Sequence, residues 1–124
     1  MLRGSGLRQP DDIVNAVGVL ASEAWVLNGT VGLLGVSQGG QVALLAAARG
    51  APVRAVWRAT TSCPGIVSYI DAVCGTDTRR RSPVNFAGDI NAPVLLVHGD
   101  ADAHVPTEQS DLMAAAFAAV RRRR

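Results

Sequence analysis

Residues 31–48 constrain the fold of this chain more than any other stretch of its sequence. The apolar run at 31–35 is typical of a strand that is buried on both faces of a sheet. A turn rich in glycine follows, and residues 38–49 then favour a helix that is apolar on nearly every side. Such a helix has to be buried itself, so the sequence predicts a strand and a helix that pack together inside a larger core.

Further strands and helices alternate along the rest of the chain, which we expect to form a single domain over residues 1–124. The expected strands lie at 53–57 and 94–97, the expected helices at 10–25, 64–73 and 107–120, and an exposed loop at 75–91. This alternation predicts parallel strand pairing with right-handed crossovers, and therefore an α/β fold of three layers around a parallel sheet. Three strands leave two unpaired edges, so we expect self-association through the open sheet edges.

The charged residues exclude several classes of function. All 12 basic residues are arginines, and the absence of lysine excludes a P-loop lysine, a Schiff-base lysine and a Ser–Lys dyad. The net charge of +2 depends on the terminal run Arg121–Arg124, because the rest of the chain has eight basic and ten acidic residues. No basic face with interleaved aromatic residues remains, so we expect no nucleic-acid partner.

No part of the sequence predicts an association with membranes or secretion. The apolar stretch 31–48 is too short and too polar to span a bilayer, since Ser37, Gln38 and Gln41 interrupt it. Residues 1–10 contain no apolar core of a signal peptide. Two cysteines do not make a disulfide framework, and free thiols are typical of a reducing cytoplasm. We therefore expect a cytoplasmic protein without a cofactor.

The sequence Gly-Val-Ser-Gln-Gly at 35–39 is the most specific motif in the chain. It lies between the predicted strand and the predicted helix, which is the context that a nucleophile elbow requires for its G-x-S-x-G sequence. So tight a turn leaves no room for side chains at Gly35 and Gly39, and it directs the Ser37 hydroxyl beyond the carboxyl end of the sheet. The backbone N–H of Gln38 can then stabilise an oxyanion at the positive end of the helix. The alternative is a turn of small residues in which Ser37 caps the helix.

A second group of polar residues, at 98–106, follows the predicted strand 94–97. In a parallel sheet, a carboxylate on such a loop lies at the functional edge. Asp102 can therefore orient a histidine imidazole, as the acid of a Ser–His–Asp triad does. Asp100 competes for the same role, and one of the two is expected to stabilise a turn of the loop instead.

The order His98, Asp100, Asp102, His104 also suggests a metal site. A spacing of two residues places all four side chains on one face of an extended segment, and a metal-dependent hydrolase is the functional alternative that follows. Gly99 and the short polar residues around it favour a bend over an extended strand, which speaks against this alternative. Without a metal, His98 is expected to be a hydrogen-bonded structural residue and His104 a loop residue.

The two motif regions together resemble a known family. The sequence VGLLGVSQGGQVALLAAA at 31–48 and the sequence PVLLVHGDADAHVPTEQS at 93–110 are similar to the α/β-hydrolase fold. The resemblance is closest to the catalytic domains of prolyl-oligopeptidase-like (S9) serine peptidases and to the neighbouring dienelactone-hydrolase-like group. It covers most of residues 10–120 and includes the Ser82-Pro83 pair ahead of the loop into the last strand.

This resemblance implies a serine hydrolase that cleaves a peptide or ester bond of a small substrate, with a peptidase favoured over an esterase. Ser37 would be the nucleophile that forms the acyl-enzyme, Asp102 the triad acid, and the Gln38 amide one half of the oxyanion hole. The glycines of the elbow would be Gly35 and Gly39.

The family pattern also indicates what the chain does not contain. In this fold the triad order is Ser, Asp, His, and the histidine follows the helix after the acid. His104 lies only two residues beyond Asp102, too close to bridge Asp102 and Ser37. We therefore expect the triad histidine beyond residue 124, a hydrolase domain incomplete at both ends, and weak or no activity of the isolated chain. A truncated or decayed fragment without catalytic function is the other alternative.

Overall fold

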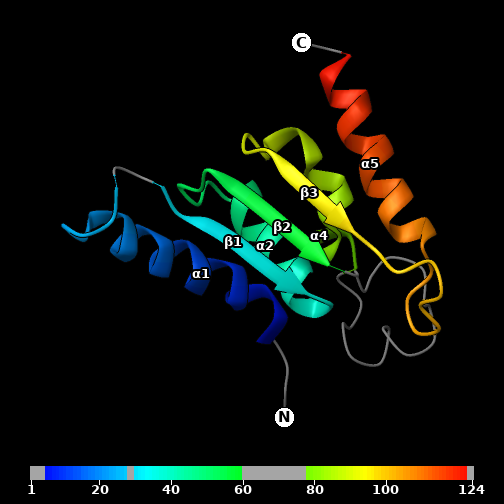
Figure 1. Ribbon diagram of the computed structural model, residues 1–124, viewed down its shortest axis with the longest axis horizontal. Helices are drawn as coiled ribbons and strands as arrows, with labels where there is room; N and C mark the ends of the chain where they lie inside the picture. The colour runs from blue at the N-terminus through cyan, green and yellow to red at the C-terminus, as the bar shows by residue number, and fades with distance from the viewer. Residues whose placement is uncertain (1–4, 28–29, 60–77, 123–124) are drawn as a thin grey trace.

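The computed structural model describes residues 5–27, 30–59 and 78–122 of the chain (Figure 1). The helix expected at 64–73 lies outside the described residues, as do both cysteines. The described part is a parallel sheet with helices packed on it, which confirms the α/β class.

Three strands form the sheet: β1 (Gly32–Val36), β2 (Ala55–Ala59) and β3 (Val94–Val97). They are paired in the order β1-β2-β3, and both pairings are parallel, as the alternation of strands and helices predicts. β3 has the predicted bounds, whereas β1 starts one residue later than predicted and β2 two residues later. Among the described strands, β1 and β3 each have one edge without a partner.

Helix α2 (Gln38–Ala48) follows directly from β1 and lies behind the sheet in the view of Figure 1. Leu44 at its centre is 0% exposed, because the sheet covers one side of the helix and other helices cover the rest. Gly50 comes two residues after the helix and has a φ of 87°, in the left-handed region that favours glycine. The prediction of a buried helix here is confirmed.

Helix α1 (Ser5–Ser22) packs on α2. It begins five residues before the predicted start at Pro10, and it ends before the predicted end near Trp25. Pro10 is the sixth residue of the helix and lies beyond its first turn, so it cannot donate the backbone hydrogen bond that another residue would make there. Asp11 of α1 and Arg49, just after α2, form an exposed ion pair of 2.7 Å, a kind of contact that contributes about 1 kcal/mol or less.

Residues 78–89 do not form the exposed loop that the sequence predicts. They form a short helix, α4 (Thr78–Arg81), and a 3-10 helix, η1 (Pro83–Asp89). Ala87 of η1 and Ile90 after it are buried in the core. The sequence predicts a loop because arginines and polar residues dominate this segment. The prediction is wrong because its few apolar residues hold the segment against α2 and the last helix.

Helix α5 (Glu108–Arg121) packs on η1 and β3. Met113 is 2% exposed, and Phe117 and Val120 pack against the core, because their spacing places all three on one face of the helix. The helix begins one residue after its predicted start at Thr107, whose side chain makes no capping hydrogen bond. Within the described ranges, every helix is too short or too polar to serve as a membrane span.

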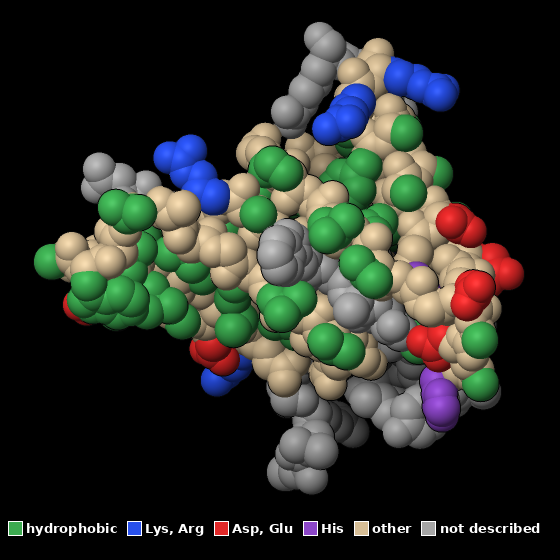
Figure 2. Space-filling model, viewed as in Figure 1, with side chains coloured by type: hydrophobic (Ala, Val, Ile, Leu, Met, Phe, Trp, Pro, Cys, Tyr) green, Lys and Arg blue, Asp and Glu red, His purple; other side chains and the backbone are tan. Residues whose placement is uncertain are grey.

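The described helices cover one face of the sheet. Leu33, Val56, Val94 and Leu96 belong to the core that α2, η1 and α5 share. The strand residues that alternate with them point to the other face and stay half exposed or more: Leu34 70%, Val36 63%, Leu95 51% and Val97 52%. This open face lies toward the viewer in Figures 1 and 2.

The open face changes one prediction. The first strand was expected to be buried on both faces, and this is wrong for β1 among the described residues, because all the described helices that contribute to the core lie on the same side. The described residues therefore supply two layers of the expected α/β sandwich, the sheet and the helices on one side of it.

Candidate active site

The turn between β1 and α2 places Ser37 at the corner of the strand and the helix. Ser37 has a φ of 52° and a ψ of −123°, and no other non-glycine residue of the described part has a positive φ. A non-glycine residue in such a backbone conformation carries strain of about 1–3 kcal/mol. Backbone strain of this kind is common at functional sites. The Ser37 side chain makes no capping hydrogen bond, so the alternative of a serine that caps the helix does not apply.

The corner is tight because the first turn of α2 lies against the end of β1. A Cβ built on Gly35 would lie 2.2 Å from the carbonyl oxygen of Gly39 and 2.5 Å from the backbone nitrogen of Gly40, closer than real Cβ contacts. Position 35 therefore requires glycine. A Cβ on Gly39 would meet no described atom within 4 Å, so the steric reason predicted for both glycines is found at Gly35 and not at Gly39.

Gln38 is the first residue of α2, so its N–H has no acceptor within the helix. The N–H groups of this first turn carry a partial positive charge, and no acidic side chain of the turn neutralises it. An oxyanion that forms next to Ser37 would therefore meet both a favourable field and a hydrogen-bond donor.

The carboxyl ends of the three strands are level. Val36 of β1 pairs with Ala59 of β2, and Ala59 pairs with Val97 of β3. Ser37 and His98 directly follow the first and third of these residues, so they start from the same edge of the sheet, two strand spacings or about 10 Å apart. Figure 1 shows the three arrowheads at this common edge. Had the two motifs been at opposite edges, no single imidazole could have connected them.

The loop that follows β3 holds Asp102 in place. Its Oδ1 accepts hydrogen bonds from the backbone N–H of His104 at 2.9 Å and of Val105 at 3.0 Å. The Asp102 side chain is 18% exposed, whereas Asp100 is an exposed loop residue. Of the two competing aspartates, Asp102 is therefore the one that the loop orients, and the same residue also stabilises the turn.

His98 is buried beneath this loop, with 6% of its side chain exposed. Its Nδ1 lies 2.7 Å from the Oγ of Ser110 in α5, and its Nε2 lies 2.9 Å from the carbonyl oxygen of Val105. These bonds confirm the hydrogen-bonded role predicted for His98. Ser110 is not among the residues predicted from the sequence, although its position carries a signal: it precedes Met113 and Phe117 on the helix face that packs inward.

The four residues of the predicted metal cluster do not assemble. Among the described residues, no three His, Cys, Asp or Glu side chains lie close enough to share a metal ion. His98 uses both ring nitrogens in hydrogen bonds, and the Oδ1 of Asp102 already accepts two amides. His104 is exposed on the loop, as predicted. The geometry of the described residues therefore gives the metal-dependent alternative no support.

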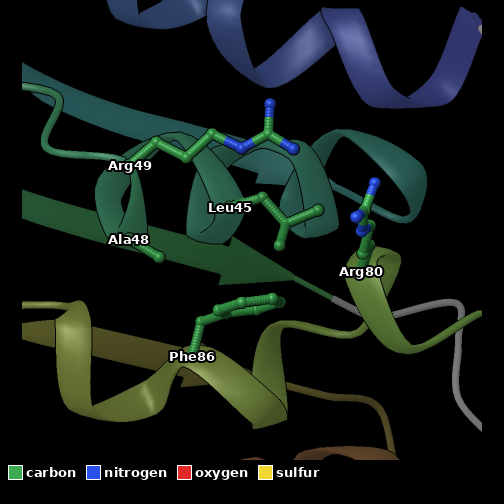
Figure 3. A pocket seen from close by; sticks show the side chains of 5 residues that line it. All are labelled: Leu45, Ala48, Arg49, Arg80 and Phe86. Carbon is green, nitrogen blue, oxygen red and sulfur yellow. The ribbon is translucent and has the colours of Figure 1, made fainter.

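Two pockets of the described part lie away from the corner. The first, of about 240 Å³, is lined by Leu45, Ala48, Arg49, Arg80 and Phe86 (Figure 3). It sits at the far end of α2 from Ser37, and α4 and η1 each contribute one residue to its lining. The second, of about 620 Å³, lies between β3, η1 and α5. Neither pocket includes Ser37 or Asp102, so the described residues that line them do not form the walls of a substrate pocket at the corner.

Solved structures with the same fold include two peptidases. Porphyromonas gingivalis dipeptidyl peptidase 4 matches 94% of this chain with a TM-score of 0.83 and 20% sequence identity. Pyrococcus horikoshii acylaminoacyl peptidase matches 94% of it with a TM-score of 0.80 and 22% identity. The match covers 18% of the first protein and 22% of the second, so this chain spans about a fifth of the length of either. At these identities the likeness shows the fold.

The family is shown by a comparison of the sequence with family models. No curated protein matches the chain, but the model of the dienelactone hydrolase family matches residues 6–123. Together with the solved structures, this match confirms the predicted resemblance to the α/β-hydrolase fold of S9 peptidases and dienelactone hydrolases. The chain belongs to the dienelactone hydrolase family.

Proposed function

We propose that this chain carries the nucleophile and the acid of a serine hydrolase that cleaves a peptide or ester bond of a small substrate. The observation that carries the proposal is the backbone of Ser37, which has a positive φ at the head of α2 while its side chain caps nothing. A glycine at this corner would be less strained, so a serine here favours a chemical role for the hydroxyl. The family membership and the place of Asp102 at the same edge of the sheet support this role.

In the proposed reaction, the Ser37 Oγ attacks the carbonyl carbon of the substrate while its proton passes to an imidazole. The carbonyl oxygen becomes an oxyanion that accepts a hydrogen bond from the Gln38 N–H. The intermediate then expels the amine or alcohol, which takes the proton from the imidazolium, and the acyl group stays on Ser37. Water attacks this acyl-enzyme in the same way, releases the acid and restores the free serine.

Asp102 would orient that imidazole and stabilise its positive charge. Neither histidine of this chain is assigned to the role of the base. The ring of His98 is buried and bonded to Val105 and Ser110, and His104 follows Asp102 too closely to reach from it to Ser37. We therefore assign the base to an imidazole supplied from outside this sequence.

The test is the rate at which a fluorophosphonate labels the 124-residue chain, with and without free imidazole as a substitute base. We expect added imidazole to raise the rate, and we expect Ser37→Ala to abolish labelling. Ser22→Ala is the matched control, because Ser22 is an exposed serine at the end of α1, and it should behave like the wild type. Undiminished labelling of Ser37→Ala would overturn the assignment of the nucleophile.

Both solved structures of similar fold are described as peptidases, and this favours a peptide substrate over an ester. Aminoacyl p-nitroanilides and p-nitrophenyl esters distinguish a peptidase from an esterase. The hydrolysis of each compound is measured with imidazole present, and Ser37→Ala gives the background rate. A peptidase releases nitroaniline faster than the background does. Turnover of the esters alone would assign an esterase.

A further inference from the structure

His98 connects three parts of the molecule that meet at the candidate site. It directly follows β3, its Nε2 lies 2.9 Å from the carbonyl oxygen of Val105 in the loop, and its Nδ1 lies 2.7 Å from the Oγ of Ser110 in α5. We infer that His98 is a positioning residue, which holds the Asp102 carboxylate in the orientation that its role as triad acid needs. This inference rests on the proposed function of Asp102.

The bond to Val105 defines which nitrogen of the ring must carry a proton. A carbonyl oxygen can only accept, so the Nε2 of His98 must carry the proton that it donates to Val105. In the neutral ring, Nδ1 then accepts a hydrogen bond from the Ser110 hydroxyl, which can rotate to donate it. A buried imidazole with both nitrogens hydrogen-bonded is a stable connection between the strand, the loop and the helix.

The connection from His98 to Asp102 passes through Val105. The N–H of this residue donates to the Oδ1 of Asp102, while its carbonyl oxygen accepts from His98. Val105 is itself 7% exposed, so it has little freedom to move between its two partners. Holding the carbonyl therefore restrains the Val105 backbone, and with it the N–H that donates to the Asp102 oxygen.

The same ring also faces the second oxygen of the carboxylate. The Nε2 of His98 lies 3.7 Å from the Oδ2 of Asp102, too far for a hydrogen bond but close enough for its polar N–H to attract the negative charge. One carboxylate oxygen is thus held by the loop and the other is drawn toward the ring. We assign the His98 ring no contact with substrate or with Ser37, so its proposed effect on the reaction passes through Asp102 alone.

Two variants separate the hydrogen bond from the presence of a polar side chain. The side-chain nitrogen of glutamine and the Nε2 of histidine are the same number of bonds from Cα, so His98→Gln keeps the donor to Val105. The side chain of asparagine is one bond shorter, so His98→Asn loses that donor. His104→Asn is the matched control on the same loop, because His104 is exposed and meets Asp102 through its backbone.

The first readout is the pair of backbone amide signals of His104 and Val105 in NMR spectra of the 124-residue chain. Both amides donate to Asp102, so we expect them to shift together as that carboxylate titrates. His98→Asn should remove this shared response, and His98→Gln and His104→Asn should keep it. A shared response that survives in His98→Asn, or that is lost equally in His98→Gln, would overturn the inference.

The second readout is the rate of fluorophosphonate labelling of Ser37 in the presence of imidazole. We expect His98→Asn to lower it by about 10- to 100-fold, as displacement of a catalytic group by about 1 Å does, and His98→Gln to restore most of the rate. If the wild type shows no labelling at Ser37, the proposed function fails, while the amide signals still decide whether His98 positions Asp102. If labelling and amide signals of His98→Asn both match the wild type, the inference fails and the proposed function stands.

A measurement on the wild type covers the case in which His98→Asn does not fold. The ¹⁵N shifts of the His98 ring report which nitrogen carries the proton. We expect the Nε2–H form with a ring proton that exchanges slowly with water. The Nδ1–H form would leave Val105 without its donor and would overturn the inference.

Discussion

The corner at Ser37 and the loop at Asp102 place two candidate catalytic groups on one edge of the sheet, but they do so by different means. The corner depends on backbone geometry: Gly35 makes room for the first turn of α2, and the serine takes a positive φ without any side-chain cap. The loop depends on side-chain hydrogen bonds from Asp102 and His98. The candidate nucleophile is therefore held by sterics over five consecutive residues, and the candidate acid by polar contacts that join a strand, a loop and a helix.

The largest expected effect comes from adding one methyl group to the corner. Gly35→Ala would place a Cβ 2.2 Å from the Gly39 carbonyl oxygen, so the backbone must shift, and we expect a loss of about 3–5 kcal/mol in the free energy of unfolding. Gly39→Ala is the matched control, since its Cβ meets no described atom and alanine favours a helix by up to about 1 kcal/mol. Urea denaturation of both variants measures the difference, and equal stabilities would contradict the steric account.

In the loop, the comparable change is Asp102→Ala. It leaves the N–H groups of His104 and Val105 without their acceptor, and we expect a loss of about 1–3 kcal/mol in unfolding free energy. Asp102→Asn keeps an oxygen acceptor and should lose less. Asp100→Ala, on an exposed neighbour, should change stability by no more than about 0.5 kcal/mol. If Asp100→Ala were the more damaging of the two alanine variants, the assignment of Asp102 as the anchored carboxylate would be wrong.

Ser110→Ala tests the helix end of the same network. It removes the hydroxyl next to the Nδ1 of His98 and leaves the bond from Nε2 to Val105 in place. We expect a loss of about 0.5–1.5 kcal/mol in unfolding free energy, typical of one hydrogen bond. Thermal unfolding checks it, with Ser22→Ala as the exposed comparison; no difference between the two would show that α5 does not depend on His98.

The smallest expected effect has the opposite sign. Ser37→Gly relieves the positive φ of the corner, and we expect the variant to gain up to about 1 kcal/mol in unfolding free energy while it loses all labelling by fluorophosphonate. Ser37→Ala keeps the strain and should not gain stability. Both variants lack the hydroxyl and differ only in the Cβ, so a glycine variant that is less stable than the alanine variant would contradict the strain assigned to the positive φ.

The corner was predictable from the sequence because all the information for it lies in consecutive residues. A short apolar run, a G-x-S-x-G turn and a helix apolar on nearly every side predict a strand, a corner and a buried helix without knowledge of any distant contact. The bounds of β3 and the inward face of α5 follow in the same way from local pattern.

Features that depend on distant contacts were not predictable. The exposure of Leu34 and Leu95 depends on which face of the sheet the helices cover, and an apolar strand carries no record of that. η1 packs through a few apolar residues without a helical period, so its sequence favours a loop. The role of Ser110 as partner of His98 depends on how the loop returns to the sheet. Local pattern thus predicted the corner at Ser37 in detail and the hydrogen-bond network around Asp102 only in part.

The most direct test of the central claim is the position of the covalent adduct after the chain reacts with a fluorophosphonate in the presence of imidazole. Digestion and peptide mass spectrometry locate the phosphonate on one residue. We expect it on the peptide that contains Ser37, at an occupancy that falls when Asp102 is replaced by Asn. A phosphonate on any other side chain, with Ser37 unmodified, would contradict the account.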